Sequence, residues 1–219
     1  MIELDNVSFS YPDGTTILNH VSMTFEEGSF SLIKGRSGTG KSSLLRLMNR
    51  LEDPREGEMR YKGRAFSAYD PEVIRSTILY IQQTHMVIIG SVKDNLMLPF
   101  TFKINRKKTR PDENTLLKLM DEFHLGNIGL DASAGQLSVG QAQRLCLIRG
   151  LLLSPEVILL DEPTSALDDE SCRIVESSVV RLCLESGKTV IMVNHRKFNS
   201  EEITPRTYKL ADGGIREET

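Results

Sequence analysis

Residues Gly35 to Ser42 of this 219-residue chain read Gly-Arg-Ser-Gly-Thr-Gly-Lys-Ser and fit the pattern G-x-x-x-x-G-K-[ST]. Glycines at these spacings let backbone N–H groups converge on the oxygens of a phosphate without clashes of Cβ atoms. Lys41 can reach the β- and γ-phosphates of a nucleotide, and the Ser42 hydroxyl can be a ligand of Mg²⁺. The eight residues therefore predict a phosphate-binding loop for a nucleoside triphosphate.

The residues that flank this loop have the composition that such a loop needs. Phe30, Leu32 and Ile33 form an apolar run typical of a buried strand, and a leucine-rich run that includes Leu44 and Leu47 follows the loop. A strand, a glycine-rich turn and a helix in this order place the first N–H groups of the helix, and the positive end of its dipole, at the phosphates. This context favours a nucleotide site over a chance match.

Two adjacent carboxylates follow another buried strand. The apolar run Val157–Leu160 ends in Asp161 and Glu162. The carboxyl ends of parallel strands face the side on which α/β proteins bind their ligands. Asp161 is then placed to hold Mg²⁺, directly or through water, and Glu162 to polarise the water that attacks the γ-phosphate. The alternative is a pair of surface carboxylates at the end of a strand.

Other polar or aromatic residues stand at similar positions. Gln83 follows the apolar run Ile78–Ile81, and His195 stands just past the run Thr189–Val193. A lone histidine is more often a structural hydrogen-bonding group than a catalytic one, but its position after a strand leaves both roles open. Tyr11 precedes a Pro-Asp-Gly turn, where its ring could stack on an adenine base or pack on its own sheet.

The peptide Leu137–Gln141, which reads Leu-Ser-Val-Gly-Gln, starts a helix that we expect over residues 139–152. Ser138 is followed three residues later by Gln141, which is the pattern of a capping box. The capping box alone indicates an ordinary start of a helix and no particular function.

Charge and composition exclude several classes of protein. The chain has 27 Lys and Arg residues against 30 Asp and Glu residues, and its formal net charge of −3 does not indicate a general nucleic-acid-binding surface. The three cysteines fit neither a disulfide framework nor a metal site, and we expect them to be buried. The apolar runs are too short to span a bilayer, and charged residues interrupt the N-terminus where a signal peptide would lie. The sequence therefore predicts a soluble, cytoplasmic protein.

The order of the expected elements indicates an α/β fold. Alternating apolar residues near the N-terminus predict antiparallel strands, and the buried strands that follow belong to a parallel sheet. From about residue 84 to residue 152 the pattern changes to helices, with apolar residues at helical spacing from Leu116 to Phe123. Within this block the basic run Arg106–Lys108, with Arg110, is expected to be a solvated loop, and a contact with lipid headgroups or a partner is the alternative.

Taken together, these motifs resemble those of the ATP-binding cassette (ABC) ATPases over almost the whole chain. They occur in that family's order, and the signature peptide that begins at Leu137 separates the family from kinases and small GTPases. The resemblance implies a single ABC ATPase domain over residues 1–219. Its RecA-like, phosphate-loop NTPase core, with a parallel sheet and an N-terminal antiparallel β subdomain, would comprise residues 1–83 and 153–219. An inserted α-helical subdomain, which carries the signature peptide, would comprise residues 84–152.

The resemblance also implies which residues bind the cofactors. Tyr11 would stack on the adenine base of ATP. The other ATP-binding residues of the same copy would be Gly35, Arg36, Ser37, Gly38, Thr39, Gly40, Lys41, Ser42 and Ser43. Mg²⁺ and its waters would be coordinated by Ser42, Gln83 and Asp161.

Catalysis would use Glu162 as the general base and His195 to steady the γ-phosphate and the attacking water, with Lys41 and Gln83 as the other catalytic residues. The remaining contacts with ATP would come in trans, from a second copy, through Ser138, Gly140 and Gln141. A helix N-terminus attracts anions, so ATP would join two head-to-tail subunits, and hydrolysis would release them.

Two residues depart from the family pattern. Val139 stands where the signature peptide usually has glycine, and a β-branched residue there restricts the backbone and adds bulk beside the phosphate. We expect Val139 to weaken the contact between subunits, although Ser138 and Gly140 remain. Arg196 follows His195 where an acidic residue is more common, and it offers a second basic group to the site or to the opposing subunit.

A finer resemblance concerns the transported substrate. Asp94–Leu96 with Pro99, and Leu147–Arg149 leading to Pro155, are similar to the small ATPase subunits of bacterial iron-efflux transporters. Such a subunit works as a homodimer on ATP binding, beneath a separate transmembrane permease, and is peripheral on the inner face of the cell membrane. Transport of phosphate, of lipid or lipoprotein, or of another small solute is the alternative.

Two other classes of protein carry the same motifs. DNA-repair and chromosome-structure ATPases separate the two halves by a long coiled coil, whereas Lys41 and Asp161 are only about 120 residues apart here, with no heptad repeat. Soluble non-transport cassette proteins, such as translation factors, usually carry two cassettes in one chain, and this chain has one set of motifs. The sequence therefore favours a transporter subunit, with no nucleic acid as a partner.

Overall fold

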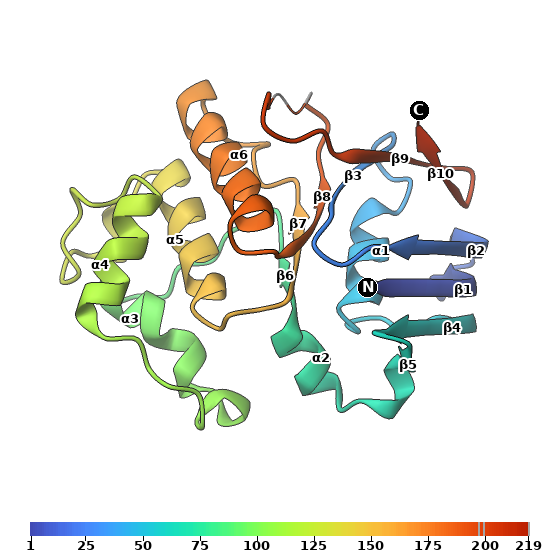
Figure 1. Cartoon of the computed structure of the whole chain (residues 1–219), viewed down its shortest axis with the longest axis horizontal. Helices are drawn as coiled ribbons and strands as arrows, with labels where there is room; N and C mark the ends of the chain where they lie inside the picture. The colour runs from blue at the N-terminus through green and yellow to red at the C-terminus, as the bar shows by residue number, and fades with distance from the viewer. Residues whose placement is uncertain (197, 199, 219) are drawn as a thin grey trace.

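The computed structural model describes residues 1–196, 198 and 200–218 and contains two β-sheets (Figure 1). The smaller sheet is antiparallel and has the strand order β2-β1-β4-β5. Its strands are β1 (Ile2–Ser10), β2 (Thr16–Phe25), β4 (Glu56–Tyr61) and β5 (Arg64–Ala65). The antiparallel strands predicted near the N-terminus are confirmed.

The larger sheet has the order β10-β9-β3-β8-β7-β6, and only β10 runs antiparallel to its neighbour. Its strands are β3 (Phe30–Lys34), β6 (Ile78–Ile81), β7 (Val157–Asp161), β8 (Thr189–Val193), β9 (Arg206–Ala211) and β10 (Gly214–Glu218). The carboxyl ends of β3, β6, β7 and β8 meet at one edge of this sheet, and the polar residues singled out in the sequence follow these four strands.

The helices are α1 (Lys41–Met48), α2 (Pro71–Thr77), α3 (Val92–Met97), α4 (Glu113–Glu122), α5 (Val139–Leu151) and α6 (Asp169–Leu184). Helices α3, α4 and α5 lie between β6 and β7 in the chain and form the block at the left of Figure 1. The predicted capping box is present at α5, because Ser138 and Gln141 each accept a hydrogen bond from the backbone N–H of the other.

Two hydrophobic clusters cover the two faces of the larger sheet. In β7, Val157 and Leu159 join the cluster formed with α1 and the smaller sheet, while Ile158 and Leu160 join the cluster beneath α4, α5 and α6. Full burial of such a side chain contributes about 1.5–3 kcal/mol, so β7 is held firmly on both faces and fixes the place of the two carboxylates at its end.

The cysteines Cys146, Cys172 and Cys183 are free and buried, as predicted. Within the part of the chain that the structure describes, no helix has the length and apolar character needed to cross a bilayer.

Candidate nucleotide-binding site

The phosphate loop connects β3 to α1, and its backbone requires glycine at several positions. Gly38 and Gly40 have left-handed φ angles of 80° and 94°. A Cβ atom on Gly35 would lie 2.5 Å from the backbone oxygen of Leu210, and one on Gly40 would lie 2.2 Å from the side chain of Ile17. These glycines let the loop turn tightly against the sheet, so that α1 begins directly at Lys41.

The Lys41 side chain is folded back over the loop. Its Nζ atom donates hydrogen bonds to the carbonyl oxygens of Gly35 and Arg36, each at 3.0 Å. Burial lowers the pKa of Lys41, while the nearby carboxylates of Glu162 and Asp161 act in the opposite direction. A phosphate at this place would favour the charged ammonium group and give it a stronger partner than the two carbonyls.

Asp161 is buried at the end of β7, and its carboxylate accepts hydrogen bonds from two hydroxyl groups. The Ser42 Oγ donates to Asp161 Oδ1 at 3.0 Å, and the Tyr80 hydroxyl donates to Asp161 Oδ2 at 2.8 Å. The structure thus brings together Ser42 and Asp161, two of the three residues predicted to bind Mg²⁺. A hydroxyl and a carboxylate are oxygen donors of the kind that Mg²⁺ prefers.

Tyr80 is a site residue that the sequence did not reveal. Burial and the hydrogen bond to Asp161 raise the pKa of Tyr80, so the phenol stays protonated and can only donate to the carboxylate. Its position on β6, three residues before Gln83, is a signal, but it becomes informative only once β6 and β7 are known to be neighbours.

Glu162 is the centre of a second group of contacts. It has a left-handed φ of 48°, which turns the chain sharply after β7 and costs about 1–3 kcal/mol for a non-glycine residue. His195 Nε2 lies 2.9 Å from Glu162 Oε1, and Gln83 Nε2 donates to Glu162 Oε2 at 3.2 Å. Three residues predicted to be catalytic therefore meet at the carboxyl ends of β6, β7 and β8.

Tyr11 lies beside α1. Its hydroxyl is 2.8 Å from Ser43 Oγ and accepts a hydrogen bond from Arg46, and its ring packs edge-on against Phe9 with 5.1 Å between the ring centroids. These contacts match the alternative of a ring that packs on its own sheet.

The signature peptide lies at the N-terminus of α5 and is organised by local contacts. Gly140 is buried, and a Cβ atom there would lie 2.7 Å from Ser171 Oγ, so glycine allows α5 to approach α6. The side chain of Val139 is 50 % exposed. Among the described residues, no hydrogen bond or ion pair joins Ser138–Gln141 to residues 35–43 of the same chain.

Arg196 contacts the first turn of α6. Its guanidinium group donates to Asp169 Oδ1 at 2.6 Å and to Cys172 Sγ at 3.0 Å. The predicted second basic group therefore has partners within the same chain, because an acidic residue opens α6 beside the loop after β8.

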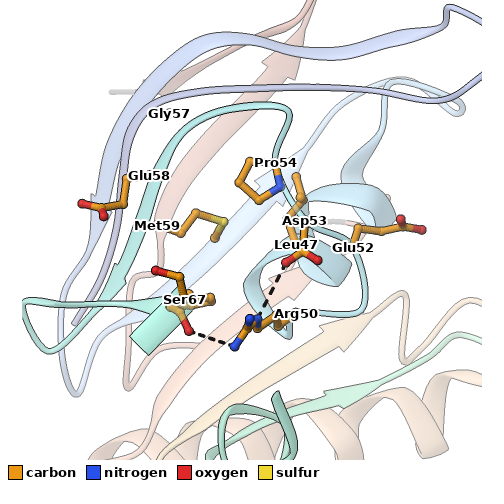
Figure 2. Close-up of a pocket in the computed structure, with 10 residues that line it drawn as sticks. Leu47, Arg50, Glu52, Asp53, Pro54, Gly57, Glu58, Met59 and Ser67 are labelled. Atoms are coloured by element: carbon orange, nitrogen blue, oxygen red, sulfur yellow. Dashed lines mark hydrogen bonds and ion pairs between the residues drawn. The ribbon is translucent and has the colours of Figure 1, made fainter. Parts of the chain in front are cut away.

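A separate pocket of about 200 Å³ lies between the end of α1 and the smaller sheet (Figure 2). Met59 points into it, whereas Glu52 and Glu58 point outward. Arg50 donates to the carbonyl oxygen of Phe66 at 2.9 Å, which joins α1 to the segment after β5. The polar contacts of this pocket serve the packing of the two parts, and the pocket is not part of the nucleotide site.

Comparison with known proteins agrees with this geometry. The family model described as ABC transporter matches residues 18–165. This chain belongs to that family. It is therefore the ATP-binding component of an ABC transporter, and its reaction is the hydrolysis of ATP coupled to transport. The family model does not reach Tyr11 or His195, and the roles of these two residues stay those that the resemblance implies.

Two curated members of the ABC family illustrate the range of relatives. The chain is 36 % identical over 197 residues to the probable iron export ATP-binding protein FetA of Escherichia coli (strain K12), with 90 % of this chain and 85 % of that protein covered. It is 34 % identical over 225 residues to the glutamine transport ATP-binding protein GlnQ of Bacillus subtilis (strain 168), with 100 % and 90 % covered.

The fold is also that of ABC cassettes. A dimeric post-hydrolysis state of the ATP-binding cassette MJ0796 bound to ADP and Pi is similar, with a TM-score of 0.82, 29 % identity, and 100 % of this chain and 98 % of that chain covered. The predicted α/β class, with a phosphate-loop NTPase core, is confirmed.

Proposed function

We propose that this ABC ATPase dimerises head to tail when it binds ATP, so that each site combines the phosphate loop of one copy with Ser138, Gly140 and Gln141 of the other. The observation that carries the proposal is the exposed start of α5, whose first turn holds no acidic residue. A helix N-terminus attracts anions, so the ATP of one copy would attract the α5 end of the other. The similar MJ0796 cassette is a dimer.

Within one copy, Ser42, Gln83 and Asp161 would hold Mg²⁺ together with its waters. When bound, Mg²⁺ neutralises charge on the β- and γ-phosphates. Lys41 would exchange its two carbonyl partners for phosphate oxygens, and the backbone N–H groups of residues 35–43 would bind the remaining ones. For Tyr11 to stack on the adenine base, its ring would have to leave its packing against Phe9.

Glu162 would accept a proton from the attacking water. Each of its two oxygens is held by a different neighbour, His195 on one and Gln83 on the other, so the carboxylate has a defined orientation before the substrate arrives. His195 would also steady the γ-phosphate, because its ring contacts Glu162 and its side chain is 44 % exposed.

We further propose that residues 84–152 form a helical subdomain on which a separate transmembrane permease docks, at the inner face of the cell membrane. Met86, Ile88 and Ile89 are exposed in the loop after Gln83. Exposed apolar residues gathered in this way mark sites of protein contact.

Iron or another metal ion is the substrate that we favour for transport, on the strength of the likeness to an iron export protein. One part of the sequence resemblance has a structural explanation, however. Asn95 is buried, and its amide group holds the preceding loop by hydrogen bonds with the backbone of Ile88 and Ser91. Stimulation of ATPase activity by Fe²⁺, compared with glutamine and phosphate, in vesicles that contain the co-purified permease would test this choice of substrate.

The dimer is tested with Glu162→Gln. Loss of the general base should lower turnover by about 1000-fold and leave ATP bound, so that sizing chromatography with Mg·ATP shows a dimer. The control Glu201→Gln removes an equal charge from an exposed residue and should behave as wild type. A Glu162→Gln protein that binds ATP but elutes only as a monomer would show the proposed dimer to be wrong.

A further inference from the structure

The segment from Thr101 to Arg110, which we call the basic segment, has an unusual charge for this protein. Five of the chain's 27 Lys and Arg residues lie in it, and no Asp or Glu occurs anywhere between Asp94 and Asp112. The whole chain has a net charge of −3, so the rest of the molecule is more acidic than that figure suggests. A strongly positive region therefore stands on a negatively charged protein.

Among the residues that the structure describes, most of these cations form no side-chain hydrogen bond or ion pair. Lys108 is the exception, because its Nζ donates to the carbonyl oxygen of Leu153 at 2.7 Å and so fastens the segment to the residues before β7. Lys103, Arg106, Lys107 and Arg110 are exposed, and among the described residues none of them forms an ion pair with a carboxylate. Four exposed cations on one short segment create a local positive field.

Two large apolar side chains are exposed on the same segment. Phe102 is 54 % exposed and Ile104 is 41 % exposed, and they stand on either side of Lys103. An aromatic ring and an aliphatic side chain among cations are typical of surfaces that lie at the boundary between lipid headgroups and acyl chains. An acidic peptide alone would leave the purpose of these apolar groups unexplained.

The segment lies away from the nucleotide site. It follows α3, at the lower edge of Figure 1, and lines a groove of about 520 Å³ together with Glu72, Arg75 and Ser76 of α2. Helix α2 ends where β6 begins, and Leu153 precedes β7, so the segment adjoins the amino ends of these strands. The nucleotide site is at their carboxyl ends.

From these observations we propose that the basic segment binds anionic phospholipid headgroups, with Phe102 and Ile104 in contact with the interfacial region of the bilayer. The basic segment and the exposed loop after Gln83 both belong to the residues between β6 and β7, on which the permease is proposed above to dock, so this inference rests on that proposal. The contact is made by one short segment of the chain and needs neither ATP nor the permease. It would hold the ATPase close to the membrane and raise its concentration near the permease.

The test is co-sedimentation of the full-length protein with vesicles of phosphatidylcholine alone or with about 30 % phosphatidylglycerol, in low and high salt, without nucleotide. We expect binding only to the anionic vesicles, and its loss in high salt because exposed charges are screened. A cation near such a surface contributes a factor of about five in affinity, so Lys103→Gln, Arg106→Gln and Lys107→Gln together should weaken binding by roughly 100-fold.

The matched control combines Lys118→Gln, Arg173→Gln and Arg216→Gln, which remove the same charge from exposed residues of α4, α6 and β10. Both triple variants should bind an ATP analogue as the wild type does, which shows that they are folded. The proposal is overturned if the wild type binds both kinds of vesicle equally, or if the two triple variants bind anionic vesicles alike.

The proposal is also overturned if the protein does not bind vesicles. If the basic segment instead binds an acidic segment of the permease in a salt-sensitive way, its surface contacts a protein partner. None of these results bears on ATP-driven dimerisation, because the vesicles hold neither permease nor nucleotide. Docking is tested separately, by co-purification of the ATPase with its permease. Failure of the lipid contact is therefore distinguishable from failure of the proposed function.

Discussion

The two halves of the proposed ATP site are built in different ways. The half around the phosphate loop is joined by hydrogen bonds between residues far apart in sequence, such as the one from Ser42 to Asp161. The half at the start of α5 is organised by the capping box of Ser138 and Gln141, within a single turn of helix. On the proposal above, the first half binds a nucleotide alone, whereas the second acts only against another copy. Substitutions should therefore separate binding from dimerisation.

The largest effect is expected from Lys41→Ala. The variant loses the one buried ammonium group of the phosphate loop, and ATP affinity should fall by about 100-fold or more, because charge-assisted hydrogen bonds to phosphate are strong. Titration with a fluorescent ATP analogue measures the change. Lys93→Ala, which removes an exposed lysine of α3, serves as the control. Tight binding by the Lys41 variant would refute the role given to this residue.

Ser138→Ala should affect the second half only. Loss of the cap should lower the free energy of unfolding by about 1 kcal/mol, leave ATP binding within about twofold, and reduce ATPase activity by about 10- to 100-fold. Ser91→Ala is a matched control, since Ser91 forms the same kind of capping box at α3. It should cost similar stability without loss of activity. Equal activities in the two variants would contradict a trans role for Ser138.

Tyr80→Phe probes the first half more gently. Without the hydroxyl, Asp161 Oδ2 loses its donor, the carboxylate is less well oriented, and the Mg²⁺ concentration needed for half-maximal binding of an ATP analogue should rise about fivefold. Binding without Mg²⁺ should stay unchanged. Tyr69→Phe removes a hydroxyl that donates to the backbone of Tyr61 and should not alter the Mg²⁺ dependence. An unchanged Mg²⁺ dependence in the Tyr80 variant would show that its bond serves packing alone.

The smallest effect is expected from Val139→Gly in the Glu162→Gln background. The valine side chain is half exposed, and its removal opens space at the start of α5. The dissociation constant of the ATP-bound dimer, measured by sedimentation, should therefore fall about threefold. The added glycine costs up to about 1 kcal/mol of helix stability, which thermal unfolding would show. A weaker dimer would mean that Val139 itself contributes to the contact.

The sequence predicted the motifs formed by consecutive residues, and it missed the contacts that depend on which elements are neighbours in the fold. The phosphate loop and the Ser138 cap are each formed by residues close together in the sequence, so their patterns are sufficient to predict them. Asp161, Glu162 and Gln83 were found because each follows an apolar run, which is also a local signal. The partners of Tyr80 and Arg196 were not found, since they lie on neighbouring elements whose adjacency no short pattern encodes.

Gly140 shows how one residue can have two explanations. The family resemblance assigns it to a contact with ATP in another copy, but the structure gives it a second reason to be glycine, the close approach of Ser171. A substitution at Gly140 would therefore shift α5 against α6 as well as alter the surface, and it is a poorer probe of dimerisation than Ser138.

The place of β3 in the larger sheet has a consequence for synthesis of the protein. This strand carries the phosphate loop, yet its neighbours are β8 and β9, which the ribosome makes roughly 10 to 30 s later at ordinary translation rates. During that interval Leu32 and Ile33 have no strand to pair with, and the loop has no fixed base. A chain interrupted before β8 therefore cannot assemble the nucleotide site, and nucleotide binding reports that translation of the sheet is complete.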